Sequence, residues 1–253
     1  MNDRIKVSGV SHSFGDRAGT VDVLAGIDLH VGRHNFVSLL GPSGCGKSTL
    51  FDVISGLLEP DEGEALVDGS TDRLGTCGYM QQRDLLMPWK VIEDNVALGL
   101  RVKGTPRAKA REKANEALER FGLGGFGKRY PSEISGGMRQ RAALARTFLA
   151  GDDVLLLDEP FGALDSLTRL QMQTWLLDVW QESEASILFI THDVEEAIRL
   201  SDRVYVLSER PAQVVLELEV NIKRPRPYDT VLTPEFAELK KQAIEHLHPG
   251  ELR

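Results

Sequence analysis

One glycine-rich stretch constrains the fold of this chain more than any other feature. The pattern G-x-x-x-x-G-K-[ST] is met by Gly41-Pro42-Ser43-Gly44-Cys45-Gly46-Lys47-Ser48-Thr49. An apolar run at 35–40 predicts a buried strand before it, and residues 47–56 predict a helix after it. Glycines in this setting let backbone N–H groups close around phosphate oxygens, while the helix directs its positive end at them. The stretch therefore predicts a nucleotide phosphate site.

We expect all nine residues of this phosphate loop to contact the nucleotide. Lys47 reaches the β- and γ-phosphates in this pattern, and Ser48 ligates Mg²⁺. The alternative is a chance glycine turn, which the flanking strand and helix argue against. Cys45 lies at a variable position of the pattern, and we interpret it as a packing residue rather than a redox switch.

A second glycine motif, Ile134-Ser135-Gly136-Gly137-Met138-Arg139-Gln140, precedes a predicted helix that ends near Ala150. Ser135 could serve only as the N-cap of that helix. The same hydroxyl, with the N–H groups of Gly136 and Gly137 and the helix N-terminus, also makes an anion site. Because the chain already holds one phosphate site, we interpret the second as one offered to the nucleotide of another copy.

Two carboxylates follow an apolar run, Val154-Leu155-Leu156-Leu157-Asp158-Glu159. A buried strand here delivers Asp158 to a metal ion, and Glu159 then lies beside the attacking water, where it can orient or deprotonate it. Strands often end in acidic residues, so this pattern alone is a weak signal. It indicates a metal and water site because a phosphate loop comes earlier in the chain.

The order of predicted strands and helices indicates an α/β fold with a mostly parallel core sheet. Residues 4–31 predict an antiparallel β subdomain, and a helical block interrupts the alternation. In that block Thr105 is expected as an N-cap, Pro106 as the first helical residue and Gly122 as the stop. We therefore divide the chain into a core (1–82 and 151–224), a helical subdomain with the second glycine motif (83–150) and a short helical tail (225–253).

Further elements are predicted in the second half of the chain. A helix is expected at 167–180, and strands at 187–190, 204–207 and 214–218. Arg224-Pro225-Arg226-Pro227 looks like a linker. A last helix is expected from Thr233-Pro234, with an apolar stripe formed by Phe236, Leu239, Ala243, Ile244 and Leu247.

Charge and composition exclude some classes of function. The formal net charge is −8, so a grip on a nucleic-acid backbone is not expected. Two cysteines give no disulfide framework and fit a reducing compartment. The start of the chain lacks a signal-peptide core, and no apolar run approaches the ~20 residues of a membrane span. We expect a soluble chain that reaches a membrane only through a partner.

Together these motifs resemble the ATP-binding subunits of ABC transporters over about residues 4–220. The resemblance implies a P-loop NTPase fold with an inserted helical subdomain, and a head-to-tail homodimer with two ATP molecules at its interface. It implies ATP and Mg²⁺ as cofactors and transmembrane permease subunits as partners, with a solute-binding protein acting indirectly. It places the chain at the cytoplasmic face of the cell membrane.

The resemblance also assigns roles to single residues. Phe14 resembles the aromatic that stacks on adenine, with a core Phe as the alternative. Gln82, beside Gln81, resembles the catalytic glutamine that senses Mg²⁺ and links to the helical subdomain. Asp165, in Gly162-Ala163-Leu164-Asp165, resembles a loop residue that touches the other subunit's site, or it only caps the next helix. His192 resembles the histidine that contacts the γ-phosphate, and Glu159 completes this catalytic set.

Other segments resemble one importer group, which carries nitrate, taurine, alkylsulfonates and pyrimidine-type precursors. Residues 136–141, Pro88-Trp89, 206–211 and 224–227 match it, although Ile134 and Met138 depart from the commonest pattern. We therefore predict the ATPase of an importer for a small anionic or heterocyclic solute. A non-transport ATPase of the superfamily, in DNA repair or translation, is the alternative, and a nucleotide kinase leaves the second glycine motif unexplained.

One apolar stretch follows Gln82 directly. We expect Leu85 and Leu86 to be core residues. Met87 and Trp89 are expected to line a groove for a short permease helix, because Met and aromatic side chains suit such contacts.

Overall fold

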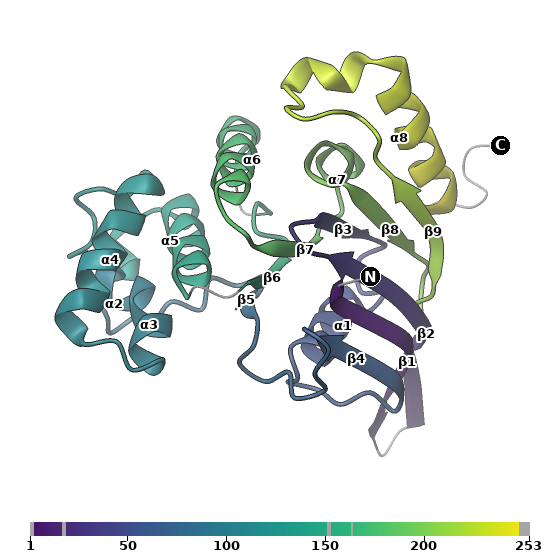
Figure 1. Cartoon of the computed structure of the whole chain (residues 1–253), viewed down its shortest axis with the longest axis horizontal. Coiled ribbons are helices and arrows are strands. Elements are labelled where there is room, and N and C mark those ends of the chain that lie inside the picture. Colours follow the sequence, from purple (N-terminus) through teal and green to yellow (C-terminus); the bar gives the residue numbers. More distant parts are fainter. Residues whose placement is uncertain (1–2, 17–18, 151–152, 163, 248–253) are drawn as a thin grey trace. The chain divides into compact units, whose positions relative to one another are not determined.

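The computed structural model describes residues 3–16, 19–150, 153–162 and 164–247, and contacts divide the chain into two compact units (Figure 1). The first unit comprises Met1–Cys77 and Glu184–Arg253, and the second comprises Gly78–Ser183. The second unit is thus an insertion in the sequence of the first. The subdivision expected from the sequence, in which 151–224 belong to the core, remains a prediction.

An antiparallel sheet forms one part of the first unit. It has the order β2-β1-β4, with β1 at Asp3–Asp16, β2 at Gly19–Gly32 and β4 at Glu62–Val67. Alternate residues of β1, such as Ile5 and Val7, are buried, as expected for a sheet with one covered face. The predicted antiparallel subdomain is confirmed.

The other strands of the first unit are mainly parallel. β3 (Phe36–Leu40) pairs in parallel with β7 (Ser186–Ile190) on one side and β8 (Arg203–Leu207) on the other. β9 (Val214–Glu219) closes this edge as the antiparallel partner of β8. Every residue of β3 and β7 is buried, which explains their nearly continuous apolar sequence.

Helices α1 (Lys47–Ile54), α7 (Val194–Leu200) and α8 (Pro234–Leu247) belong to the same unit, with a short 3₁₀ turn η2 at Tyr228–Leu232. The Thr233 hydroxyl accepts a hydrogen bond from the Phe236 N–H at 3.3 Å and so caps α8. Phe236 and Ala243 are buried against residues of α7, β8 and β9, and Leu239 and Leu247 pack partly on the same cluster. The expected apolar stripe of the last helix is confirmed at these four residues, while Ile244 is only partly buried.

The segment expected as a linker is instead tightly fixed to the first unit. The Arg226 side chain is buried, and its guanidinium donates to the carbonyl oxygens of Ile222, Ile198 and Val220 at 2.8, 2.9 and 3.0 Å. It also donates to the carbonyls of Arg199 and Ser201. The linker prediction was wrong because one planar five-donor side chain satisfies carbonyls at the end of α7 and after β9.

The second unit holds a parallel pair of strands and five helices within the part that the structure describes. β5 (Gly78–Met80) pairs with β6 (Val154–Asp158). The helices are α2 (Ile92–Val96), α3 (Leu98–Val102), α4 (Arg107–Arg120), α5 (Gly136–Leu149) and α6 (Ser166–Gln181), with a 3₁₀ turn η1 at Pro131–Glu133. Among the described residues of both units, no helix has the length and apolar character needed to cross a bilayer.

Two local expectations in the second unit were wrong. Pro106, not Thr105, is the N-cap of α4, because its extended backbone precedes Arg107 and its carbonyl accepts the first helical bond, from Ala110 at 2.9 Å. Leu85 is 52% exposed rather than buried, and its φ is +45°. Leu86, by contrast, is buried as expected.

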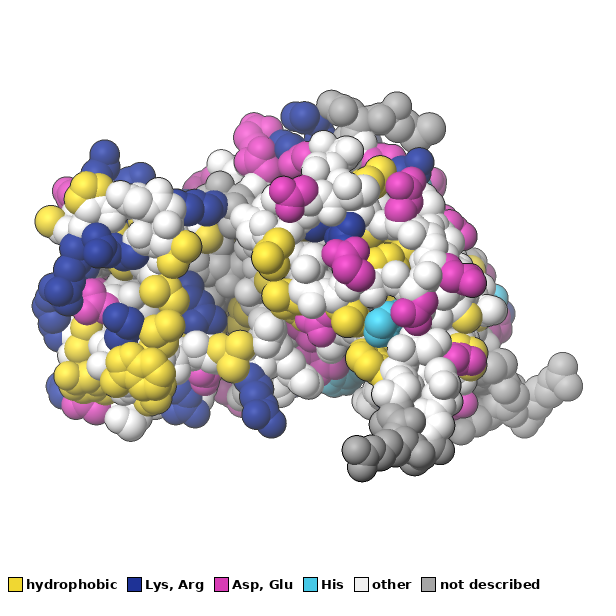
Figure 2. All heavy atoms as spheres, turned by 90° about the horizontal axis from the view of Figure 1, so that it is seen from below, with side chains coloured by type: hydrophobic (Ala, Val, Ile, Leu, Met, Phe, Trp, Pro, Cys, Tyr) yellow, Lys and Arg dark blue, Asp and Glu magenta, His cyan; other side chains and the backbone are white. Residues whose placement is uncertain are grey.

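Surface charge is unevenly distributed. The face shown in Figure 2 carries mainly Lys, Arg and hydrophobic side chains on the second unit and mainly Asp and Glu on the first. The net charge of −8 therefore does not describe each unit.

Candidate functional site

The phosphate loop lies between β3 and α1 in the first unit. Gly46, the N-cap of α1, has a φ of +128°. A Cβ at Gly46 would lie 2.8 Å from Cγ1 of Val23, so the position has no room for a side chain. The turn before it is closed by a hydrogen bond of 3.2 Å from the Cys45 N–H to the Pro42 carbonyl. The local sequence thus requires glycine for both backbone conformation and space.

Lys47 is buried at the start of α1. Its ammonium donates to the carbonyls of Gly41 and Pro42, each at 2.9 Å, so the cation is held inside the loop. The loop therefore combines an ammonium, N–H groups and the positive end of a helix, which is the donor set that phosphate needs. Cys45 is buried, and this burial raises the pKa of its thiol against the opposing charges of Lys47 and Arg210. A thiol with a raised pKa is less reactive, in line with a packing role.

His192 lies at the same sheet edge as the phosphate loop. It follows β7, whose neighbour β3 leads into the loop, and the Thr191 N–H donates to the Leu39 carbonyl at 3.3 Å. Asp193 then caps α7 by accepting from the Glu196 N–H at 3.1 Å. His192 itself is exposed.

Phe14 lies on β1 of the first unit, opposite Val21. Its ring is 49% exposed and meets the buried His12 ring edge to face, with 4.7 Å between the centroids. An aromatic ring with an open face and one fixed edge is suited to stack on a planar ligand.

The second unit brings Gln82 and Glu159 together. They follow the parallel neighbours β5 and β6, and the carboxyl ends of such strands meet at one edge. Gln82 Nε2 donates to Glu159 Oε2 at 3.3 Å. Asp158, the last residue of β6, is buried. An amide and two carboxylates are hard oxygen ligands of the kind that Mg²⁺ takes.

Ser135 and Asp165 are both helix caps. Ser135 accepts from the Met138 N–H at 3.2 Å at the start of α5, and Asp165 accepts from the Thr168 N–H at 3.0 Å at the start of α6. The bond from Thr168 is the main cause that lowers the pKa of Asp165. Ala163, in the loop before Asp165, lies outside the described residues. Ser135 caps its helix with a neutral hydroxyl, whereas the carboxylate of Asp165 places a negative charge at the start of α6.

Three side chains that the sequence reasoning missed join the segment after Gln82 to α5. Arg139 Nε lies 3.1 Å from Asp84 Oδ2. Arg146 donates to the carbonyls of Asp84 and Leu85 at 2.7 and 2.9 Å. This grip on the Leu85 carbonyl accompanies the left-handed backbone that leaves the Leu85 side chain exposed. No signal in one sequence pairs residues so far apart.

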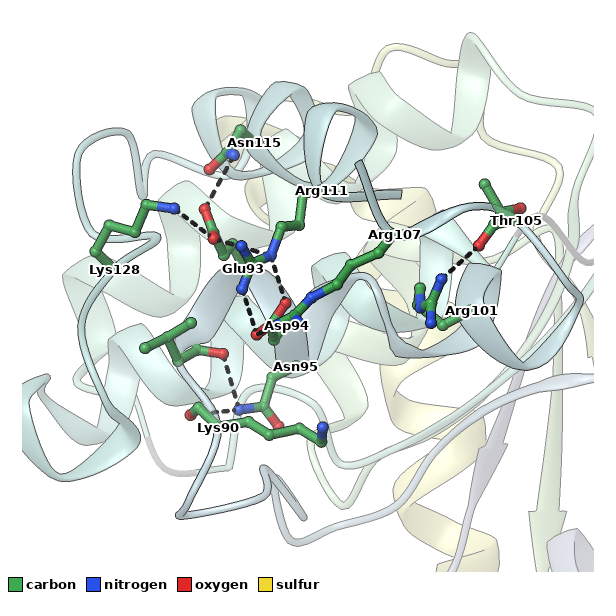
Figure 3. Close-up of polar contacts among 11 residues, drawn as sticks. Lys90, Glu93, Asp94, Asn95, Arg101, Thr105, Arg107, Arg111, Asn115 and Lys128 are labelled. Atoms are coloured by element: carbon green, nitrogen blue, oxygen red, sulfur yellow. Dashed lines mark hydrogen bonds and ion pairs between the residues drawn. The ribbon is translucent and has the colours of Figure 1, made fainter. Parts of the chain in front are cut away.

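A polar network fixes the chain that leads to the second glycine motif (Figure 3). Glu93, 1% exposed at its side chain, lies 2.6 Å from Lys128 Nζ and 3.2 Å from Arg111 Nε. Asp94 receives two bonds of 2.7 Å from Arg111 and one of 3.1 Å from Arg107. The backbone of α2 also bonds the loop at Gly127 and Arg129. The loop before Ser135 is therefore held against α2 and α4.

Comparison with known proteins agrees with this geometry. The protein-family model described as "ABC transporter" matches residues 24–162. The chain is 40% identical to an aliphatic sulfonates import ATP-binding protein, SsuB, of Bacillus cereus, covering 98% of this chain and 97% of the relative. It is 42% identical to a taurine import ATP-binding protein, TauB, of Rhizobium johnstonii, with the same two coverages.

A solved structure has the same fold. It is a dimer of the ATP-binding cassette MJ0796, in a post-hydrolysis state bound to ADP and Pi. The TM-score is 0.78 at 28% identity, covering 87% of this chain and all of the other. These findings confirm the expected P-loop ATPase fold and ATP hydrolysis as the activity. The chain therefore belongs to the ABC transporter family, as one of its ATPases.

Proposed function

We propose that this chain is the ATP-hydrolysing subunit of an importer for a small anionic or heterocyclic solute, with organic sulfonates such as taurine as the first candidates. The observation that carries the proposal is the similarity, over nearly the full length, to ATP-binding proteins named for sulfonate and taurine import. These relatives favour transport over the alternative of an ATPase in DNA repair or translation.

We further propose that the chain binds MgATP through the residues singled out above. Lys47 neutralises the β- and γ-phosphates, and Ser48 ligates Mg²⁺ with Asp158 and Gln82. Mg²⁺ neutralises charge on the phosphates when bound. Glu159 orients or deprotonates the attacking water. The bond between Gln82 and Glu159 supports their acting together, since it holds the carboxylate that faces the water.

The remaining predicted residues complete the site from the same chain and from a second copy. His192 contacts the γ-phosphate, and Phe14 stacks on adenine. Ser135, with the N–H groups of Gly136 and Gly137, binds the γ-phosphate of the nucleotide held by the other copy, and Asp165 approaches that site as well. The dimeric cassette of similar fold supports this arrangement.

The test is the variant Glu159→Gln. It keeps the shape of the side chain and one accepting oxygen but removes the base, so ATP should bind and persist. We expect the variant to elute as a dimer in size-exclusion chromatography with MgATP and as a monomer without nucleotide. Its steady-state hydrolysis should fall at least about a hundredfold, the lower range for loss of a general base.

The double variant Glu159→Gln with Lys47→Ala is the matched control. Without the ammonium the γ-phosphate has lost its main countercharge, so ATP should no longer produce the dimer. A Glu159→Gln protein that binds ATP and still elutes only as a monomer would contradict the two-copy site.

Partner subunits are the second part of the proposal. The chain works at the cytoplasmic face of the membrane with transmembrane permease subunits, and a solute-binding protein delivers the cargo to them. On the second unit Trp89 is 72% exposed, which supports its role in docking a permease helix. Trp89 lies in the stretch between Gln82 and α2. Arg139 and Arg146 of α5 hold the earlier part of this stretch, at Asp84 and Leu85.

Replacing Trp89 by Ala tests this docking site. We expect weaker co-purification with the cognate permease and reduced solute uptake, while ATP hydrolysis by the isolated chain stays near the wild-type rate. Val102→Ala, another exposed apolar residue of the second unit, is the control and should leave the complex intact. Unchanged assembly and uptake in Trp89→Ala would place the docking site elsewhere.

A further inference from the structure

The turn between β8 and β9 reaches back to the phosphate loop. Arg210, in this turn, donates from Nε to the carbonyl oxygen of Gly44. Its Nη2 lies 3.5 Å from where a Cβ would stand at Gly44. The guanidinium therefore lies directly against the middle of the loop, although Arg210 is far from it in the sequence.

The turn that carries Arg210 is fixed at both ends. The Ser208 N–H donates to the Gln213 carbonyl at 3.0 Å, which closes the turn. Two residues after Arg210, the Ala212 N–H donates to the Val23 carbonyl at 2.9 Å, and the Ala212 carbonyl accepts from the Ala25 N–H at 3.0 Å. The arginine thus extends from a backbone that is anchored to β2.

Strand β2 also packs against the other end of the loop. Val23 is the residue that leaves no room for a side chain at Gly46. At Gly41 a Cβ would lie 3.1 Å from Cβ of Leu207, the last residue of β8. The phosphate loop is therefore held between β2 and the end of β8, and Arg210 is the charged side chain within this contact.

The hydrogen bond to Gly44 controls the direction of one loop peptide. Because a peptide is planar and trans, the carbonyl of Gly44 and the N–H of Cys45 point in opposite directions. The opposite end of this peptide is held too, because the Cys45 N–H donates to the Pro42 carbonyl at 3.2 Å. The bond from Arg210 therefore fixes the peptide that closes the turn of the loop. A guanidinium donor is charged, so it also polarises that peptide and adds positive potential beside the phosphate site.

We propose that Arg210 is a positioning residue of the phosphate loop, which raises the affinity for nucleotides that carry a β-phosphate by holding the Gly44–Cys45 peptide, and with it the turn from Pro42 to Cys45, in place. This rests on the proposed function, because it takes residues 41–49 as the phosphate site. Arg210 acts through the loop and is distinct from the ammonium of Lys47, which contacts the phosphates.

The experiment compares Arg210→Met and Arg210→Lys with the control Arg33→Met. Arg33 is an exposed arginine of the same unit, so its variant makes the same charge change away from the loop. Titrations with fluorescent mant-ADP and mant-AMP in the presence of Mg²⁺ give the dissociation constants. The melting temperature of each nucleotide-free protein reports any loss of the fold.

We expect Arg210→Met to raise the dissociation constant for mant-ADP about three- to tenfold, as for loss of one charge-assisted hydrogen bond at an exposed site. Arg210→Lys should fall between wild type and Arg210→Met, since an ammonium still donates to the carbonyl. Binding of mant-AMP, and of mant-ADP by Arg33→Met, should change by less than about twofold. The melting temperature of nucleotide-free Arg210→Met should equal that of Arg33→Met.

Three results would overturn the positioning role. The first is an unchanged dissociation constant for mant-ADP in Arg210→Met. The second is a dissociation constant for mant-AMP that rises as much as that for mant-ADP. The third is Arg210→Lys binding mant-ADP no more tightly than Arg210→Met. Lys47→Ala, measured in parallel, separates this idea from the proposed site. If Lys47→Ala loses mant-ADP and Arg210→Met does not, only the role of Arg210 fails. If Lys47→Ala binds normally, the phosphate site itself is refuted.

Discussion

Backbone strain marks the carboxylate to which we assign the attacking water. Glu159 has a φ of +45°, a region that costs a non-glycine residue roughly 1–2 kcal/mol. It is held there by the bond from the Gly162 N–H to its carbonyl, at 3.1 Å, and by Gln82 at its side chain. Backbone strain of this kind gathers at functional sites, in line with the role proposed for Glu159.

Asp94 provides a pH-dependent test of the network around α2. Hydrogen bonds from Arg111, and next from Arg107, lower its pKa from 3.8 to about 2. Because the folded pKa lies below the unfolded one, the carboxylate stabilises the fold fully above pH ~4, and this contribution disappears as the pH falls through about 2. Asp94→Asn should therefore lower the free energy of unfolding by about 1–2 kcal/mol at pH 7.

Urea unfolding of wild type and Asp94→Asn across the acid range checks this prediction. The difference in midpoint should stay constant down to pH ~4 and shrink toward pH ~2. Asp229→Asn, an exposed acid of the first unit, is the control. A difference that persists undiminished at the lowest pH would show that packing, and not the ion pair, carries the effect.

Single residues were predictable where a local rule applied. Ser135 and the glycines of the phosphate loop follow from capping and from the conformations that only glycine adopts easily. The contacts of Asp84 with Arg139 and Arg146 could not be predicted, because these residues are distant in sequence and only the fold brings them together. The same is true of Arg210.

At the scale of elements, the pattern of apolar residues predicted several strands and helices within about two residues, whereas the short elements β5, α2, α3 and α7 were not predicted. The buried run of β3 and the stripe of α8 are examples, since burial imposes the period that the sequence shows. The pattern of apolar residues does not predict how a segment packs when a buried polar contact fixes it. Residues 224–227 contain no apolar period, yet Arg226 fixes them to the end of α7.

Arg226 offers a test of this anchor. Its removal leaves several buried carbonyls without their donor, so Arg226→Met should lower the free energy of unfolding by about 2–4 kcal/mol. Arg226→Lys should recover only part of this, because an ammonium has three donors and no planar fork. Thermal unfolding measures both effects, with the exposed Arg33→Met as the matched control.

If Arg226→Met lowered the free energy of unfolding no more than Arg33→Met does, the hydrogen bonds of Arg226 would not be what fixes this segment. The position is informative for function as well. Carbonyls of α7 are among the acceptors of Arg226, and α7 begins at Val194, two residues after His192. Lys240 of α8 adds an ion pair of 2.6 Å to Glu195 of α7. The tail thereby supports the helix that follows His192, the residue proposed to contact the γ-phosphate.

At the scale of the whole molecule, the motif order was enough to predict the family and the fold, because each motif fixes both a backbone conformation and a chemical group. The second glycine motif led to the prediction that two copies pair. A chain that binds one nucleotide by itself has no role for this motif. The cargo did not follow, since no residue of an ATPase subunit needs to contact it.

Complementation of two inactive variants tests the two-copy site. Lys47→Ala should fail to bind ATP, and Ser135→Arg should bind ATP without hydrolysing it, because the bulky cation obstructs the nucleotide of the other copy. In a mixed dimer one site carries both defects and the other carries none. An equal mixture should therefore recover about a quarter of the wild-type rate if pairing is random and the sites act independently.

The measurement is ATP hydrolysis across mixing ratios, with each variant alone as the baseline. Loss of ATP binding by Ser135→Arg alone would contradict the assignment, since it would place Ser135 at the nucleotide of its own chain.

The insertion of the second unit has a consequence for how the chain is made. Strand β3 pairs with β7 and β8, which follow it by well over a hundred residues. At roughly 5–20 residues per second, the ribosome supplies these partners roughly ten to thirty seconds after β3 emerges. During that interval the apolar strand β3 lacks both of its neighbours, while the inserted unit, Gly78–Ser183, is being synthesised and is completed just before β7. The phosphate loop is thus synthesised early but reaches its final setting among the last parts of the protein, and a chaperone that covers β3 has its main task in this window.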